Sequence, residues 1–254
     1  MSENLLLETC LKQLRLPTFL HNYRKFAEDA AQANLDYDRY LLSLAEHEIA
    51  HREKNREEHR IKAAHFPLLK ELADFDFSCV SSLNKLQVLD LARGAYLQKA
   101  ESIILVGNPG LGKTHVATGL ALAACRQGRK VRFYNAAGLV NDLILAQEKH
   151  LMPRFLASTL KNHLIVLDEL GFIPFDPHGA QLMFQFCAAL YERTSMIVTT
   201  NLRFADWTQI FQDERLTGAL LDRLTHRATV LEFIGESYRF RQRMEKQTQL
   251  EVRT

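Results

Sequence analysis

The chain has 254 residues, of which 47% are apolar, so it can bury a packed core and is not disordered by composition. Its formal net charge of +2 argues against a protein that binds nucleic acid by charge alone, as a histone does. Its four cysteines form no C-x-x-C pair, no signal peptide opens the chain, and no apolar stretch approaches the ~20 residues of a membrane span. We therefore expect a soluble, cytoplasmic protein.

The N-terminal part of the chain is predicted to be helical. Leucines recur at helical spacing before Pro17, which begins a second helix, and Asp36 caps a long third helix over about Tyr37 to Ala64. The second half of that helix, His51 to Lys62, is almost all charged, with opposite charges three or four residues apart. It is either a solvated helix without a special role or a surface that meets DNA or a partner subunit.

A linker is predicted around Asp74–Ser78, which divides a small all-α N-terminal domain, residues 1–75, from a larger domain, residues 76–254. The pattern is helical again as far as Ala100 and then changes to short β-rich runs that alternate with helices. The predicted strands are Ser102–Val106, Val131–Asn135, His163–Leu167 and Met196–Thr200, with Thr229–Phe233 as a possible fifth. Strands separated by helical segments predict an α/β fold with a central parallel sheet.

A phosphate-binding loop follows the first predicted strand. Residues 107–114 fit G-x-x-x-x-G-K-[ST], with a strand before them and a helix after them. The glycines let backbone N–H groups surround phosphate oxygens, Lys113 is expected to reach the β and γ phosphates, and Thr114 is expected to bind Mg²⁺. A chance glycine turn is the alternative. The predicted cofactors are ATP and Mg²⁺, and the predicted nucleotide contacts are Gly107, Asn108, Pro109, Gly110, Leu111, Gly112, Lys113, Thr114 and His115.

Two adjacent acids end the third predicted strand, which places them at the edge of the sheet where α/β proteins bind ligands. Asp168 is expected to bind or orient Mg²⁺, and Glu169 to act as the general base for the attacking water. Asn201, after the fourth strand, could position that water or cap the turn. Arg223 lies on a later amphipathic helix, where it is either a surface residue or a group that acts on a neighbouring subunit's nucleotide.

Together these residues resemble the AAA+ subgroup of bacterial helicase loaders and IstB-type transposition helper proteins, and IstB most specifically. The resemblance covers nearly the whole chain. Besides the phosphate-binding loop it rests on residues 11–17, 35–37, 62–67, 74–77 and 166–171 and on Asn201-Leu202 with Trp207. It implies ATP-dependent self-assembly on duplex DNA, bending of that DNA, and recruitment and stimulation of the partner transposase of an insertion sequence.

The resemblance also implies roles for single residues. Asn201 would sense the γ-phosphate, Arg223 would be the arginine finger in trans, and Arg239 would contact the γ-phosphate in cis. Arg241 and Arg243 lie beside Arg239 and leave the last assignment open. The pair Thr199-Thr200 stands where a Thr-Ser pair is more usual, which is a mild departure.

Two clusters of basic residues are candidates for DNA contact. One is Lys149, His150, Arg154 and Lys161, in the mostly helical segment before the acid-bearing strand, and the other is Arg52, Arg56, Arg60 and Lys62. Such residues would bind phosphates with little base readout, or would simply be solvated.

Three other functions are alternatives. The N-terminal resemblance argues against the first, Glu169 and Arg223 argue against the second, and the features that the third needs are not identified in the sequence. The first is a replicative helicase loader, which would bind a hexameric helicase and single-stranded DNA. The second is a nucleotide-gated scaffold in which hydrolysis is incidental. The third is a small-molecule kinase, which would need an acceptor pocket and a lid.

Overall fold

The computed structural model describes residues 2–235 and 237. It divides into two compact units that meet between His59 and Arg60, rather than after residue 75 as the sequence predicted. The segment 60–75 belongs to the second unit because its apolar side chains pack there. Ala64 is fully buried in the core of that unit, and the ring of Phe66 meets Phe133 edge-on at a centroid distance of 6.1 Å.

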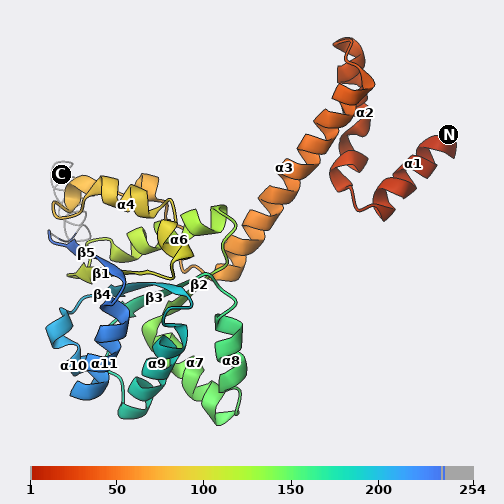
Figure 1. The fold of residues 1–254 in the computed structure, drawn as a ribbon. Coiled ribbons are helices and arrows are strands. Elements are labelled where there is room, and N and C mark those ends of the chain that lie inside the picture. The colour runs from red at the N-terminus through yellow and green to blue at the C-terminus, as the bar shows by residue number, and fades with distance from the viewer. Residues whose placement is uncertain (1, 236, 238–254) are drawn as a thin grey trace, which may run out of the picture. The chain divides into compact units, whose positions relative to one another are not determined.

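The first unit is helical, as expected. Its helices are α1 (Ser2–Gln13), α2 (Pro17–Gln32) and the greater part of α3 (Tyr37–Ala64) (Figure 1). Pro17 occupies the first turn of α2, and Asp36 Oδ1 accepts a hydrogen bond from Arg39 N at 2.8 Å. The start signals predicted for the second and third helices are thus confirmed.

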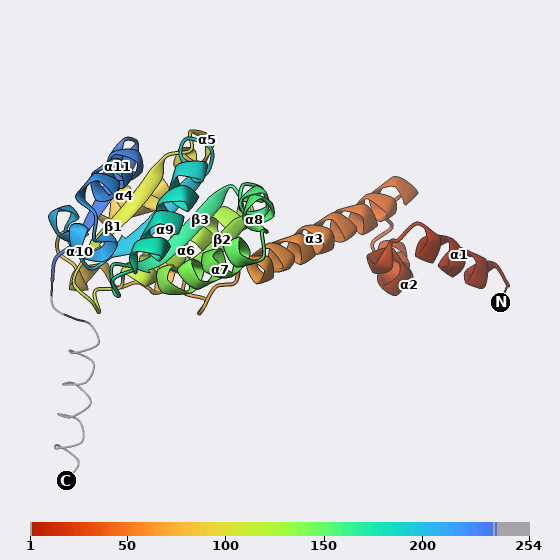
Figure 2. The same ribbon diagram turned by 90° about the horizontal axis from the view of Figure 1, so that it is seen from below.

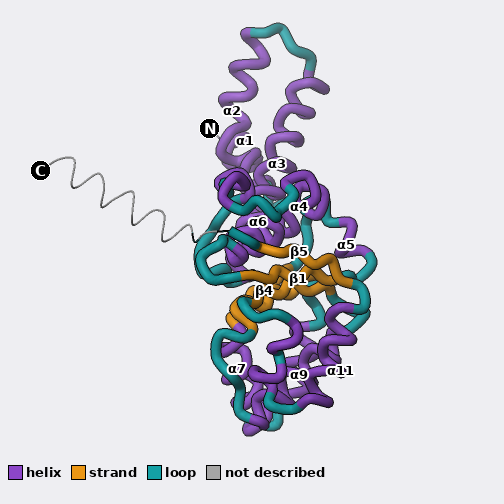
Figure 3. The backbone as a smooth tube through the Cα atoms, turned by 90° about the vertical axis from the view of Figure 1, so that its left-hand side faces the viewer, coloured by secondary structure: helices purple, strands orange, loops and turns teal. Residues whose placement is uncertain are grey.

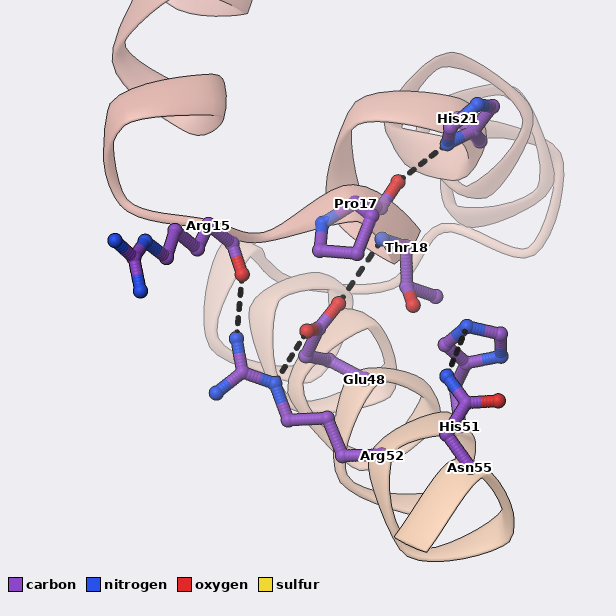
Figure 4. A network of polar contacts seen from close by, with 8 residues as sticks. All are labelled: Arg15, Pro17, Thr18, His21, Glu48, His51, Arg52 and Asn55. Atoms are coloured by element: carbon purple, nitrogen blue, oxygen red, sulfur yellow. Dashed lines mark hydrogen bonds and ion pairs between the residues drawn. The ribbon is translucent and has the colours of Figure 1, made fainter. Parts of the chain in front are cut away.

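A buried carboxylate joins the helices of this unit (Figure 4). Glu48, 4% exposed, accepts hydrogen bonds from Thr18 N at 3.0 Å and from Arg52 Nε at 2.6 Å. Leu16 offers no side-chain cap to α2, so Glu48 satisfies a backbone donor that would otherwise be unpaired. Arg52 also donates to the carbonyl of Arg15 at 2.6 Å, which gives this member of the second basic cluster a structural role.

The second unit contains a five-stranded parallel sheet in the order β2-β3-β4-β1-β5. The strands are β1 (Ser102–Gly107), β2 (Val131–Asn135), β3 (Leu164–Leu170), β4 (Ser195–Thr200) and β5 (Ala228–Phe233). The predicted strands are confirmed, including the fifth. The third strand begins one residue later than predicted and continues past its two acids.

Helices cover both faces of this sheet (Figure 3). One face packs against α4 (Lys85–Leu91), α5 (Ala95–Gln98) and α6 (Lys113–Arg126). The other packs against α7 (Ala136–Glu148), α8 (Met152–Thr159), α9 (Pro177–Leu190), α10 (Thr208–Phe211) and α11 (Glu214–Thr225), and Figure 2 shows α7, α9 and α11 side by side. Short 3-10 turns are η1 (Leu72–Asp74), η2 (Phe77–Cys79) and η3 (Phe204–Asp206). Adjacent β1 residues alternate between the faces, so Ile103 and Ile104 enter different cores.

The segment between the linker and β1 differs from the prediction. It holds two short helices rather than a continuous helical pattern, because Gly94 adopts a left-handed φ of 78° between them. Asn84 caps the first of them by accepting a hydrogen bond from Leu86 N at 2.9 Å. Among the helices that the structure describes, none is both long and apolar enough to cross a membrane.

Candidate active site

The loop after β1 curls because two of its glycines adopt left-handed backbone angles. Gly110 and Gly112 both have φ of 85°. A Cβ at Gly112 would lie 2.6 Å from Cε2 of Phe75, and one at Gly110 would overlap the side chain of Ser237. Side chains are thus excluded for both steric and conformational reasons. The loop ends at the N-terminus of α6, whose backbone N–H groups and dipole favour an anion.

Lys113 lies inside this loop. Its Nζ donates to the carbonyls of Gly107 at 2.6 Å and Asn108 at 2.8 Å. The ammonium is therefore positioned above the curled backbone, where phosphate oxygens would be alternative acceptors. This arrangement fits a triphosphate in the loop.

The Asp168 carboxylate accepts hydrogen bonds from two hydroxyl groups, those of Thr114 and Thr199. Thr114 Oγ1 donates to its two carboxylate oxygens at 2.9 and 3.1 Å, and Thr199 Oγ1 donates to Oδ1 at 2.6 Å. Burial raises the pKa of Asp168, the two hydroxyls oppose that rise, and nearby Glu169 adds to it. A cation beside this carboxylate would relieve the cost of its burial, which fits the predicted Mg²⁺ site.

Glu169 occupies an irregular point of β3. Its φ is 60°, and the pairing of β3 with β4 shifts register between Leu167 and Leu170. Left-handed residues other than glycine are strained by about 1–2 kcal/mol and occur often at functional sites. Glu169 is exposed whereas Asp168 is buried, so the two adjacent acids have different surroundings.

Two residues that were not predicted from the sequence, Asn135 and Thr199, form hydrogen bonds with this pair of acids. Asn135, at the end of β2, donates from Nδ2 to Glu169 Oε2 at 2.9 Å. The Thr199 hydroxyl accepts from Glu169 N at 2.9 Å while it donates to Asp168. Asn135 could have been identified from the sequence as a polar residue at the end of the second predicted strand. In the structure that strand pairs with β3, and Asn135 is in register with Asp168.

Several of the predicted residues line a cavity of 440 Å³. Lys113, Thr114, Glu169 and Asn201 line it, together with His115. The remaining wall includes a segment before β1, with Lys70, Asp74, Phe75, Asp76, Cys79 and Val80. The volume lies within the range of roughly 300–1,000 Å³ of small-molecule sites, which suits a nucleotide.

His115 and Asn201 lie in different parts of this cavity wall. The His115 Nε2 atom is 2.7 Å from the carbonyl oxygen of Glu71, which ties the residue to the segment before β1. Asn201 follows β4, and the turn there is closed by Leu202 N, which donates to the Thr200 hydroxyl at 3.2 Å. Thr200 therefore closes this turn, which was the alternative role considered for Asn201.

Arg223 is not part of this cavity. Its guanidinium donates to the carbonyl of Ala219 at 2.7 Å and lies 5.1 Å from the ring centroid of Phe184. It borders a small hollow with Ser102 and Met196, at the amino ends of β1 and β4. The nucleotide cavity is at the opposite, carboxyl edge. Arg239, Arg241 and Arg243 lie outside the described residues.

Few protein groups are available to hold a metal ion. Among the described residues, no three His, Cys, Asp or Glu side chains gather as a metal site. A Mg²⁺ ion bound at Thr114 and Asp168 would complete its octahedron with phosphate and water oxygens, as Mg²⁺ commonly does in nucleotide sites.

A family model described as IstB-like ATP binding protein matches residues 9–246. The chain belongs to this family. The predicted resemblance is confirmed, and ATP binding is a property that the family's description includes.

Full-length relatives of this IstB-like chain come from bacterial insertion sequences. It is 34% identical to an insertion sequence IS232 protein from Bacillus thuringiensis subsp. berliner, over 95% of this chain and 96% of the relative. It is also 34% identical to an insertion sequence IS21 protein from Pseudomonas aeruginosa, over 93% and 89% of the two chains. The names of both relatives ascribe ATP binding to them.

Solved structures share the fold of the IstB-like chain. The replication initiator DnaA, bound to AMPPCP and single-stranded DNA, aligns with a TM-score of 0.55 and 18% identity, over 74% of this chain and 57% of DnaA. The structure of DnaI aligns with a TM-score of 0.52 and 17% identity, over 65% and 91%. The predicted fold, an AAA+ α/β domain preceded by helices, is confirmed.

Proposed function

We propose that this IstB-like protein is a Mg²⁺-dependent ATPase that assembles on duplex DNA and bends it. In this proposal it also recruits and stimulates the partner transposase of an insertion sequence. Full-length similarity to insertion-sequence proteins supports the transposition context over helicase loading.

One observation carries the ATPase part of the proposal. Lys113, Thr114 and the candidate base Glu169 line one cavity, and the Thr114 hydroxyl donates to Asp168, the second candidate ligand of Mg²⁺. A site for nucleotide binding alone would not need the second acid. The strained backbone of Glu169 supports a specific use for that side chain.

Each residue has a proposed part in hydrolysis. Lys113 and the loop amides bind the β and γ phosphates. Thr114 and Asp168 would hold Mg²⁺, which would supply positive charge beside the phosphate oxygens. Glu169 accepts the proton of a water that Asn201 orients toward the γ-phosphorus. The new bond joins that water's oxygen to the γ-phosphorus, the bond to the bridging oxygen of ADP breaks, and ADP and phosphate are released.

Arg223 supports the assembly part of the proposal. It lies at the sheet edge opposite the cavity of its own chain. We propose that it reaches the cavity of a neighbouring protomer and stabilises charge on the transferred phosphoryl group. Turnover would then require assembly, and DNA would stimulate turnover by promoting assembly.

Electron microscopy of the protein with ATP and duplex DNA tests the proposal, with Lys113→Ala as the control. We expect oligomers of wild-type protein that contain bent DNA, and none with Lys113→Ala, which cannot bind ATP. Adding the partner transposase should give a stable complex and faster strand transfer. If wild-type protein assembled only when a hexameric helicase was supplied, the helicase-loader function would replace the one proposed.

A further inference from the structure

Two loops meet beyond the amino ends of β2 and β3, at the sheet edge opposite the nucleotide cavity. Lys130 precedes β2 and His163 precedes β3. Lys130 N donates to His163 Nδ1 at 3.0 Å, and Lys130 O accepts from His163 N at 2.8 Å. These bonds hold the two loops together as one continuous surface.

The two loops belong to segments that carry positive charge without acidic neighbours in sequence. Between Lys113 and Asp142 the chain has four arginine or lysine residues and no acid, and between Glu148 and Asp168 it has three and no acid. In a chain with 30 acids and 32 basic residues, such segregation is not a property of the whole surface. Arg129, Lys130 and Lys161 from these two segments lie in the two loops.

A fourth positively charged residue, Arg60, lies near the C-terminal end of α3. Arg60 Nε donates at 2.8 Å to the carbonyl of Cys125, in the last turn of α6. Gly128 N donates to the same carbonyl at 3.1 Å, so Arg60 reaches the loop that carries Arg129. Arg60, Arg129, Lys130 and Lys161 are called the amino-end basic surface below.

The pKa of His163 agrees with the positions of Arg129 and Lys130 beside it. Burial, followed by the positive charges of Arg129 and Lys130, lowers the pKa of His163 below its usual range. The two cations therefore act on a ring that belongs to the neighbouring loop. Within the described chain, the side chains of Arg129, Lys130 and Lys161 form no hydrogen bond or ion pair, and Lys130 and Lys161 are exposed.

Cations near a helix C-terminus can serve stability alone. Such a cation interacts favourably with the negative end of the helix dipole. Arg60 has this role, since it bonds a terminal carbonyl of α6 directly. Interaction with the helix dipole does not explain the unpaired side chains of Arg129, Lys130 and Lys161. Bringing like charges close together costs electrostatic free energy.

We infer that the amino-end basic surface binds phosphates of the DNA backbone. The inference rests on the proposed function and gives its DNA contact a place on the sheet edge away from ATP. The contacts would be ionic, dependent on salt and without sequence preference, as suits a protein that binds many target sites. Arg129 and Lys130 were in neither of the basic clusters that the sequence suggested.

The test is the affinity of Arg129→Ala/Lys130→Ala for a labelled DNA duplex, measured by fluorescence anisotropy with a non-hydrolysable ATP analogue at several salt concentrations. Arg93→Ala/Lys99→Ala is the matched control, because it also removes one arginine and one lysine, here both from exposed positions outside the amino-end basic surface. We expect the first variant to bind about tenfold more weakly at physiological salt, with a salt slope reduced by roughly 1–2. The control should bind like wild type.

A charge-preserving exchange separates an ionic role from a structural one. Arg129→Lys/Lys130→Arg should keep wild-type DNA affinity, and ATP affinity should be unchanged in all variants because the cavity is at the other sheet edge. If wild type binds DNA and Arg129→Ala/Lys130→Ala binds equally well, or if the exchange variant loses affinity, the inference is overturned and the proposed function stands. If wild-type protein itself does not bind duplex DNA, the proposed function fails instead.

Discussion

Asn135 and Glu169 are joined by a hydrogen bond of 2.9 Å between the side-chain amide of one and the carboxylate of the other. The same Asn135 caps α7 through Oδ1, which accepts from Ala137 N at 3.2 Å. A carboxylate oxygen that accepts a hydrogen bond from an amide is held toward that amide and is less free to approach a water molecule. The bond therefore restrains the proposed general base.

Asn135→Ser should release this restraint. Serine caps helices about as well as asparagine but is too short to reach Glu169. We expect ATP turnover without DNA to rise by about tenfold, because a hydrogen bond to a charged group contributes roughly 1.5–3 kcal/mol, while the melting temperature changes little. Steady-state ATPase assays measure the first and differential scanning fluorimetry the second. Unchanged or slower turnover in a fully stable variant would show that the bond does not restrain catalysis.

Glu169→Gln should separate binding from hydrolysis. The amide cannot accept the proton of the attacking water, so we expect turnover to fall by about 100-fold or more, with ATP affinity close to that of wild type. Assemblies on DNA should persist, since ATP is not consumed. Turnover can be followed by phosphate release and assembly by light scattering. Wild-type turnover in this variant would mean that another group is the base.

Arg223→Ala should bind ATP but lose turnover that depends on assembly, by roughly 10³-fold for an arginine finger. Arg227→Ala is the control, since Arg227 borders the same hollow. Mixing Arg223→Ala with Lys113→Ala should restore partial activity, because an intact cavity then meets an intact arginine at some interfaces. No recovery over a range of mixing ratios, with both variants folded, would contradict action in trans.

Asp168 should make hydrolysis dependent on pH. Burial raises the pKa of Asp168 above its ordinary value, and Mg²⁺ would bind the ionised carboxylate. Turnover should therefore increase as pH rises through that pKa. Thr199→Val removes a hydrogen bond that lowers this pKa, so the acidic limb of the pH profile should move to higher pH. A pH profile of kcat/KM for both proteins checks this, and an unmoved acidic limb would exclude Asp168 as the titrating group.

Asp168→Asn should lose activity without losing stability. Above its ordinary pKa, the buried carboxylate costs folding free energy, and the neutral amide avoids that cost. Without nucleotide, the melting temperature at neutral pH should equal or exceed that of wild type, while turnover falls by about 100-fold or more because charge stabilisation by the metal is lost. A clear drop in melting temperature would show instead that the carboxylate is needed for folding.

Glu48 should make the first unit sensitive to acid. Burial opposes its ionisation, but hydrogen bonds from Arg52 and Thr18 outweigh burial and lower its pKa below the ordinary 4.5. This stabilisation is present above that value and is lost as pH falls through the lower, folded pKa. Glu48→Gln should cost about 1–3 kcal/mol at neutral pH. Urea titrations across pH, with exposed Glu46→Gln as control, should show the acid-dependent part disappear only in Glu48→Gln.

The sequence predicted what periodicity and local motifs encode. The bounds of the long helix Tyr37–Ala64, the order of strands and helices, and the loop around Lys113 all follow from spacing within short segments. The acids after the third strand could be assigned to the sheet edge because parallel strands end together.

Contacts between residues that are far apart in the sequence could not be predicted from local patterns. The Glu48 bond to Thr18 joins residues thirty positions apart, and the Thr199 bond to Asp168 joins residues thirty-one apart. No local pattern distinguishes Arg52, which holds a turn, from its charged neighbours on the same helix. The domain boundary was displaced for the same reason, because the packing of Ala64 depends on β2 and α6 rather than on the linker composition.

The Thr199 hydroxyl forms hydrogen bonds with both Asp168 and the backbone of Glu169, which limits how this protein can be engineered. If Asp168 holds Mg²⁺ as proposed, a variant selected for a different divalent ion must change the surroundings of Asp168, and a change at Thr199 also affects the neighbouring peptide. Libraries that aim at manganese or calcium preference should therefore randomise positions 168, 169 and 199 jointly, since single-site searches would discard useful pairs.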